Sequence, residues 1–167
     1  MKKILVALLA LFTVSFNLYA KKMEMIDTNG THYNVEAEGN DIKIEGMEGK
    51  IVFIEFFGLK CPACKEEIPH LINLQSKYPN KLKIMAIEVQ KNDNDPINTF
   101  KKQHGINYTT FSNYDVGYVV RYIAEKSKWQ GEIPFIVAID KKGKVQFVQT
   151  GIMSEKELEE HIEKFSK

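Results

Sequence analysis

A continuous apolar run, IVFIEFF at residues 51–57, limits the possible folds more than any other stretch of this chain. A half-buried strand would alternate apolar and polar side chains, whereas this run carries a single charge, Glu55. Such runs are typical of strands that are covered on both faces of a parallel sheet. We therefore expect a central strand here, in a sheet with helices on both sides.

The rest of the chain alternates between helical and strand patterns. Apolar residues at helical spacing predict helices at residues 62–78, 96–103, 114–125 and from Ser154, where Glu157 completes a capping box. Strand patterns occur at residues 82–89, 107–111, 134–139 and 145–148, after shorter strands within 23–46. This order predicts an α/β fold whose mostly parallel sheet ends in one antiparallel hairpin.

The first twenty residues differ in character from the rest. Two lysines precede an apolar stretch at residues 4–16, and Leu18-Tyr19-Ala20 resembles a cleavage site. This pattern is typical of a secretory signal peptide, and the stretch is shorter than the about 20 residues that cross a bilayer. We expect residues 1–20 to be removed, leaving residues 21–167 as one domain in the periplasm or another extracytoplasmic space. An uncleaved membrane anchor is the alternative.

Charge balance and cysteine content exclude several classes of protein. The 167 residues contain 23 Lys and Arg against 22 Asp and Glu, so no basic surface for nucleic acid is indicated. The two cysteines, Cys61 and Cys64, could form only one disulfide, which is too few for a fold of this size to be stabilised mainly by disulfides. In an exported protein, two cysteines confined to one CxxC motif indicate reactive rather than structural sulfur.

The CxxC motif follows the central strand and opens the next predicted helix. Cys61 falls near the N-cap, and Pro62 stands at the first helical position, where proline is well tolerated. The positive end of the helix dipole, with Lys60 and Lys65 nearby, should lower the pKa of the Cys61 thiol. Cys64 lies one turn later and should be more buried and protonated. We expect Cys61 to attack or be attacked, and Cys64 to resolve the mixed disulfide.

Two acidic residues are candidates for proton transfer at this motif. If Glu55 is buried, its pKa should rise, and it could take the proton of Cys64 and return it. The alternative is that Glu55 points to solvent at a strand edge. Glu67 follows the motif and is a second candidate to tune Cys64.

The segment IEFFGLKCPACK resembles the active-site strand and helix start of thioredoxins. Pro69 stands where thioredoxins carry a kinking proline, and Glu55 stands where they carry a buried aspartate. Ile133-Pro134 matches their cis-proline. The resemblance implies that this dipeptide faces the CxxC motif and helps to bind the partner chain.

Within that superfamily the chain is most similar to the TlpA/ResA/DsbE group. Its CxxCxxExP pattern is matched at Cys61, Cys64, Glu67 and Pro69. Residues 96–111 resemble the group's central helix–strand insertion, and the leading strands resemble its N-terminal β extension. The implied fold is thioredoxin-like, with a central mixed sheet flanked by helices.

This resemblance implies an exported thiol–disulfide oxidoreductase. We expect a monomeric reductant of extracytoplasmic protein disulfides, with apocytochrome c as one candidate substrate and a membrane thiol–disulfide protein as electron donor. Cys61, Cys64, Glu55 and Glu67 are the candidate catalytic residues. The residues assigned to partner binding are Ile133, Pro134, Pro62 and Ala63.

The sequence departs from the group's pattern at a few positions near the site. Lys60 replaces a tryptophan, Phe135 replaces a threonine, and a longer loop at residues 125–132 brings Trp129 near the predicted site. These departures bear on the choice of partner more than on the reaction.

Other functions remain open from the residues alone. Electrons could flow the other way, which would make the protein a disulfide-forming oxidant of the same fold. Both thiolates could instead bind copper(I), although the four scattered histidines do not complete a zinc site. The cysteines could also be inert in a binding module. We predict no metal and no cofactor beyond a redox-active Cys61–Cys64 disulfide, since no glycine-rich phosphate loop is present.

Overall fold

The structure is a computed structural model that describes residues 20–167. The predicted signal peptide, residues 1–20, lies outside the described residues apart from Ala20. The strands are β1 (Lys21–Ile26), β2 (His32–Glu38), β3 (Asp41–Ile44), β4 (Ile51–Phe57), β5 (Leu82–Glu88), β6 (Thr109–Ser112), β7 (Phe135–Ile139) and β8 (Val145–Thr150). The helices are α1 (Pro62–Lys77), α2 (Asn94–His104), α3 (Asn113–Ser127) and α4 (Glu155–Phe165). Among these, no helix has the length and apolarity needed to cross a membrane.

The predicted central strand is β4, and all seven of its residues are buried. It lies in the middle of a five-stranded sheet with the order β6-β5-β4-β7-β8. β4 pairs in parallel with β5, and β5 in parallel with β6, whereas β7 is antiparallel to both β4 and β8. The predicted mixed sheet is therefore confirmed, with β7 as the one strand that runs against the others.

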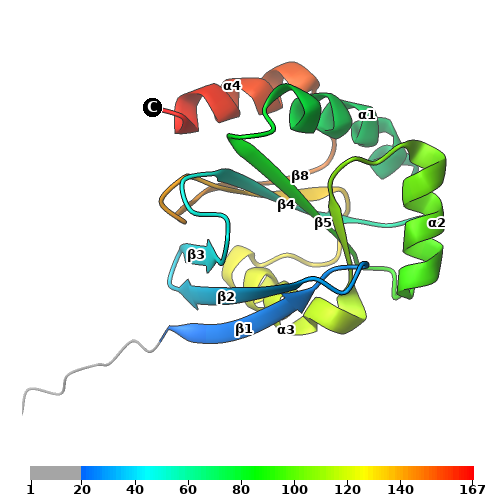
Figure 1. The fold of residues 1–167 in the computed structure, drawn as a ribbon, viewed down its shortest axis with the longest axis horizontal. Helices are drawn as coiled ribbons and strands as arrows, with labels where there is room; N and C mark the ends of the chain where they lie inside the picture. The colour runs from blue at the N-terminus through cyan, green and yellow to red at the C-terminus, as the bar shows by residue number, and fades with distance from the viewer. Residues whose placement is uncertain (1–19) are drawn as a thin grey trace, which may run out of the picture.

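Helices and a second small sheet cover the two faces of this central sheet (Figure 1). α1 and α4 lie on one face, and α3 lies on the other together with the antiparallel sheet β1-β2-β3. Alternate side chains of β4 point to opposite faces. Phe53 and Phe57 thus join the apolar cluster under α1 and α4, and Ile54 and Phe56 join the cluster under α3.

Several predicted element boundaries shift by one or two residues, as three examples show. α2 begins at Asn94 rather than Pro96, because a proline in the first turn removes an N–H that has no intrahelical partner. The strand predicted at residues 107–111 is β6, Thr109–Ser112. α3 continues to Ser127, so the loop predicted at residues 125–132 begins only at Lys128.

The capping box predicted for the last helix is confirmed. The Ser154 side chain accepts from the Glu157 N–H, and the Glu157 carboxylate accepts from the Ser154 N–H. The helix presents Leu158, Ile162 and Phe165 to the core. α4 is thereby fixed against the face of the sheet that carries the CxxC motif.

Candidate functional site

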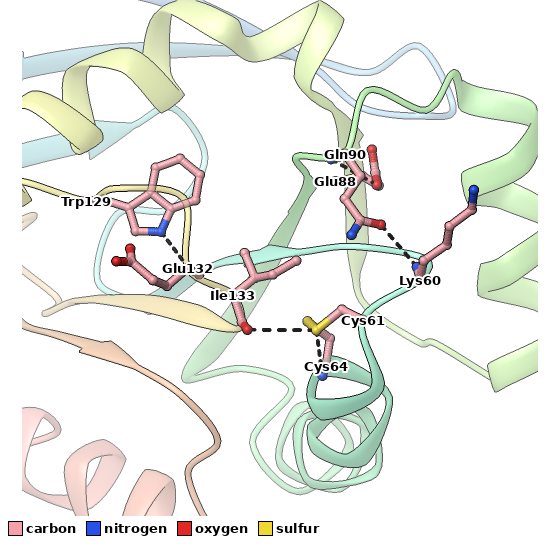
Figure 2. Close-up of a disulfide and its surroundings, with 8 residues drawn as sticks. All are labelled: Lys60, Cys61, Cys64, Glu88, Gln90, Trp129, Glu132 and Ile133. Carbon is pink, nitrogen blue, oxygen red and sulfur yellow. Dashed lines mark hydrogen bonds between the residues drawn. A yellow bond between two sulfur atoms is a disulfide. The ribbon is translucent and has the colours of Figure 1, made fainter.

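The two cysteines lie where β4 ends and α1 begins, as the sequence predicts. Cys61 is the N-cap of α1, and its Sγ accepts from the Cys64 backbone N–H at 3.0 Å. Pro62 occupies the first turn of the helix and is exposed, and Ala63 is half-buried. The two sulfurs form a disulfide, with the Cα atoms 5.3 Å apart (Figure 2).

The two cysteines differ in exposure. Cys61 keeps 7% of its surface exposed, whereas Cys64 has none. Thiol–disulfide exchange needs an incoming sulfur to reach one sulfur of the bond. Only Cys61 offers that access, which agrees with the prediction that Cys61 attacks or is attacked and Cys64 resolves the mixed disulfide.

Ile133 and Pro134 lie beside the disulfide, although they are distant in sequence. The peptide bond between them is cis, as the resemblance implies. The carbonyl oxygen of Ile133 is 3.9 Å from the Sγ of Cys61 (Figure 2). Ile133 is half-buried and Pro134 is buried. The structure therefore places this predicted partner-binding dipeptide against the more exposed sulfur.

Glu55 lies inside the protein, so the alternative of a solvent-facing side chain is wrong. It is 1% exposed and pairs with Ala86 and Ile136, which belong to the same apolar cluster as Cys64. Neither carboxylate oxygen has a hydrogen-bond partner among the described residues. Burial, and secondarily the charge of Glu67, raises the pKa of Glu55 well above its ordinary value.

Glu67 is also completely buried, on the inner side of α1. Its Oε1 accepts the Met153 N–H at 2.8 Å, while its Oε2 has no partner among residues 20–167. Burial raises the pKa of Glu67 from 4.5 to about 7, and the Met153 N–H and nearby His70 oppose that rise. This carboxyl is therefore close to half ionised near neutral pH.

Sequence reasoning missed Tyr108 as a neighbour of the two acids. Its side chain is 3% exposed and belongs to the apolar cluster that contains both cysteines. Burial raises its pKa well above the ordinary tyrosine value, and the charges of Glu55 and Glu67 add to this. Tyr108 immediately precedes β6, and no local pattern in the sequence relates it to the two acids, because the fold alone brings them together.

Trp129 lies near the site, as predicted, but in a shorter loop than expected. Its ring is half-buried and meets Phe56 edge-on, with 4.9 Å between ring centroids. The indole N–H donates to the Glu132 carbonyl oxygen at 2.6 Å (Figure 2). Since Glu132 precedes Ile133, this bond fixes the segment that contacts Cys61.

Gln90 and Glu88 were also missed by sequence reasoning. Both come from the end of β5 and the loop that follows, on the side of the disulfide where Lys60 lies (Figure 2). Gln90 accepts from the Lys60 N–H, and Glu88 is a fully buried carboxylate. No group of three or more His, Cys, Asp or Glu side chains within residues 20–167 is arranged to hold a metal ion.

Comparison with known proteins assigns this arrangement to a family. The model of the AhpC/TSA family matches residues 21–148, which include both cysteines and the cis-proline. The chain belongs to the AhpC/TSA family. Its similarity is to the TlpA/ResA/DsbE group, and this AhpC/TSA-family chain carries its CxxC motif between the buried strand β4 and the helix α1.

Sequence relatives of this AhpC/TSA-family chain include thiol–disulfide oxidoreductases named ResA. The protein from Bacillus thuringiensis subsp. konkukian is 28% identical over 173 residues, which cover 98% of this chain and 95% of the relative. The protein from Bacillus subtilis (strain 168) is 26% identical, over 76% of this chain and 68% of the relative. This AhpC/TSA-family chain is therefore a thiol–disulfide oxidoreductase.

Solved structures show the same fold. StoA from Bacillus subtilis has a TM-score of 0.62 at 16% identity, over 86% of this chain and 97% of that one. A thiol:disulfide interchange protein of the thioredoxin family from Chlorobium tepidum TLS has a TM-score of 0.66 at 19% identity, over 89% and 96% of the two chains. The AhpC/TSA-family chain thus has a thioredoxin-like fold.

Proposed function

We propose that the protein acts outside the cytoplasm and reduces disulfides in exported proteins, with apocytochrome c as a candidate substrate. The observation that carries this proposal is the asymmetric disulfide at the start of α1. Its outer sulfur, on Cys61, is partly exposed beside the Ile133 carbonyl, and its inner sulfur, on Cys64, is fully buried. This arrangement supports attack by one cysteine and resolution by the other.

The proposed reaction begins with the reduced protein. The Cys61 thiolate attacks one sulfur of the substrate disulfide, so that a mixed disulfide forms and the first substrate thiolate leaves. Cys64 then loses its proton and attacks the Cys61 sulfur. The second substrate thiolate leaves, and the Cys61–Cys64 disulfide forms. Two electrons have then passed to the substrate, and a membrane thiol–disulfide protein is the proposed donor that restores the dithiol.

The proton of Cys64 needs an acceptor inside the protein. An ordinary thiol has a pKa of about 8.5, and a carboxyl whose pKa is raised by burial is a correspondingly stronger base when ionised. We assign this role to Glu55, with Glu67 setting the charge next to it. The accepted proton is returned to the second leaving thiolate, so Glu55 ends in the ionised form in which it began.

A trapping experiment tests the proposal. The variant Cys64→Ser cannot resolve the mixed disulfide, so substrates remain attached to Cys61 and can be identified by mass spectrometry. We expect exported proteins whose disulfides are the targets of reduction, including apocytochrome c, together with a membrane donor. The control Cys61→Ser should trap nothing. Recovery of secreted substrates with a quinone-linked oxidase, and no donor, would show that the protein is an oxidant.

The cellular location has its own test. We propose that residues 1–20 direct export and are removed after Ala20, just before β1 begins. Mass measurement of the protein purified from the extracytoplasmic fraction should show a chain that starts at Lys21. A full-length chain in the membrane fraction would instead support the uncleaved anchor.

A further inference from the structure

A tight turn connects the end of β4 to Cys61. The Cys61 N–H donates to the Gly58 carbonyl oxygen at 3.1 Å, which closes the turn just before α1. Lys60 lies within this turn, and its backbone N–H makes its hydrogen bond to a partner outside the turn. Any change in this turn moves Cys61 relative to the helix N-terminus.

Gln90 supplies that partner. Its Oε1 accepts from the Lys60 N–H at 3.1 Å, and the two residues are 30 positions apart in sequence (Figure 2). Gly58 makes room for this contact, since a Cβ atom at that position would lie 2.3 Å from the Gln90 Cδ. Because Gly58 has no side chain, the Gln90 side chain can lie against it.

A buried carboxylate holds Gln90 in place. Glu88 has no exposed surface, and it accepts from the Gln90 N–H at 3.1 Å and from the Asn92 N–H at 2.9 Å. The Asn92 side-chain amide adds a third bond to it at 2.8 Å. Burying a carboxylate is costly unless it is hydrogen-bonded. Here all of those bonds are directed at the short segment that carries Gln90.

We propose that Gln90 is a positioning residue for Cys61. By holding the Lys60 N–H, it keeps the turn in the conformation that sets the Cys61 sulfur at the helix N-cap, where the Cys64 N–H and the helix dipole stabilise a thiolate. This inference rests on the proposed role of Cys61 as the attacking cysteine. It assigns a function to the loop after β5 that the CxxC motif itself does not reveal.

The test measures how fast Cys61 reacts with iodoacetamide across pH in the reduced protein. In Gln90→Met the side chain keeps its length but loses the acceptor. We expect the pKa of Cys61 to rise and the rate at pH 6 to fall about threefold to tenfold, the effect of losing one hydrogen bond. The plateau rate at high pH should stay unchanged, because the sulfur remains accessible. Gln103→Met, at an exposed position of α2, is the matched control and should behave like wild type.

Gly58→Ala provides an independent way to break the same contact. Its added methyl group displaces the Gln90 carboxamide, so it should reproduce the Gln90→Met effect. The double variant Gly58→Ala/Gln90→Met should then be no slower than Gln90→Met alone. A wild-type pKa in Gln90→Met, or additive effects in the double variant, would overturn the inference. If the wild-type protein itself shows no low-pKa thiol at Cys61, the proposed attack by Cys61 fails instead.

Discussion

Glu67 makes the stability of the oxidised protein depend on pH. Its pKa is about 7 in the folded protein against 4.5 for an ordinary glutamate. Between these values the folded state holds a proton that the unfolded state has released, so raising the pH favours unfolding. The stabilisation is complete below pH 4.5, falls through this window and is lost above about pH 7. A difference of about 2.5 between the two pKa values corresponds to about 3 kcal/mol.

The variant Glu67→Gln tests this dependence. Its amide cannot ionise, while its oxygen can still accept the Met153 N–H. Urea unfolding of both oxidised proteins at pH 4.5 and pH 8 should show that wild type loses about 3 kcal/mol relative to the variant. Equal changes in the two proteins would mean that the pKa of Glu67 is the same in the folded and unfolded states.

Glu55 should lower the stability of the folded protein while it speeds resolution by Cys64. Both of its oxygens lack hydrogen-bond partners inside an apolar layer, which costs roughly 1–3 kcal/mol. Glu55→Leu should therefore raise the free energy of unfolding by a similar amount. It should also slow resolution by Cys64 about a hundredfold, the low end of what a positioned acid or base contributes. Stopped-flow release of a model substrate measures the second effect, and a variant that is both less stable and fully active would contradict this role.

At the level of elements, the loop from Lys128 to Pro134 carries the segment that we propose binds the partner chain, and Trp129 fixes this segment through Glu132. Trp129→Phe keeps an aromatic ring against Phe56 but loses the indole N–H. We expect the KM for a protein disulfide to rise about threefold to tenfold. The rate with a small disulfide should change little, because a small molecule makes few contacts with this loop. Equal losses with both substrates would indicate a general disturbance of the site.

Local patterns were sufficient to predict the elements that hold the cysteines. The uninterrupted apolar run predicted a strand buried on both faces, and Pro62 after Cys61 predicted the start of α1. Boundaries were less accurate where two signals compete. Pro96, for example, was read as the first residue of α2, although a first turn accepts proline at several positions.

The contacts between elements could not be predicted in the same way. Gln90 accepts a hydrogen bond from the Lys60 backbone N–H, and the Met153 backbone N–H donates one to Glu67. No spacing in the sequence relates the two residues of either pair. Burial of Glu55 was predictable, because its neighbours on β4 are all apolar. Its lack of hydrogen-bond partners was not, since this depends on what β5 and β7 place beside it.

At the scale of the whole molecule, the disulfide links the redox state of the protein to its stability. In a strong oxidant of this kind the reduced form is stabilised relative to the oxidised form. Each 1.4 kcal/mol of that difference in free energy corresponds to about 30 mV of reduction potential. If the protein is a reductant as proposed, the oxidised form should be the more stable one, by about 1–3 kcal/mol. Guanidinium unfolding of the oxidised and reduced proteins measures this difference. A more stable reduced form would indicate an oxidant.

The close approach of the Gln90 side chain to Gly58 also has an evolutionary consequence. Because a Cβ atom there would collide with the Gln90 side chain, a larger residue at position 58 requires the side chain at position 90 to move or to be shorter. Among relatives that share this turn, we expect larger residues at position 58 to occur with short side chains at position 90. A glycine that looks like a simple turn residue would then mark the lineages in which the loop after β5 supports the reactive cysteine.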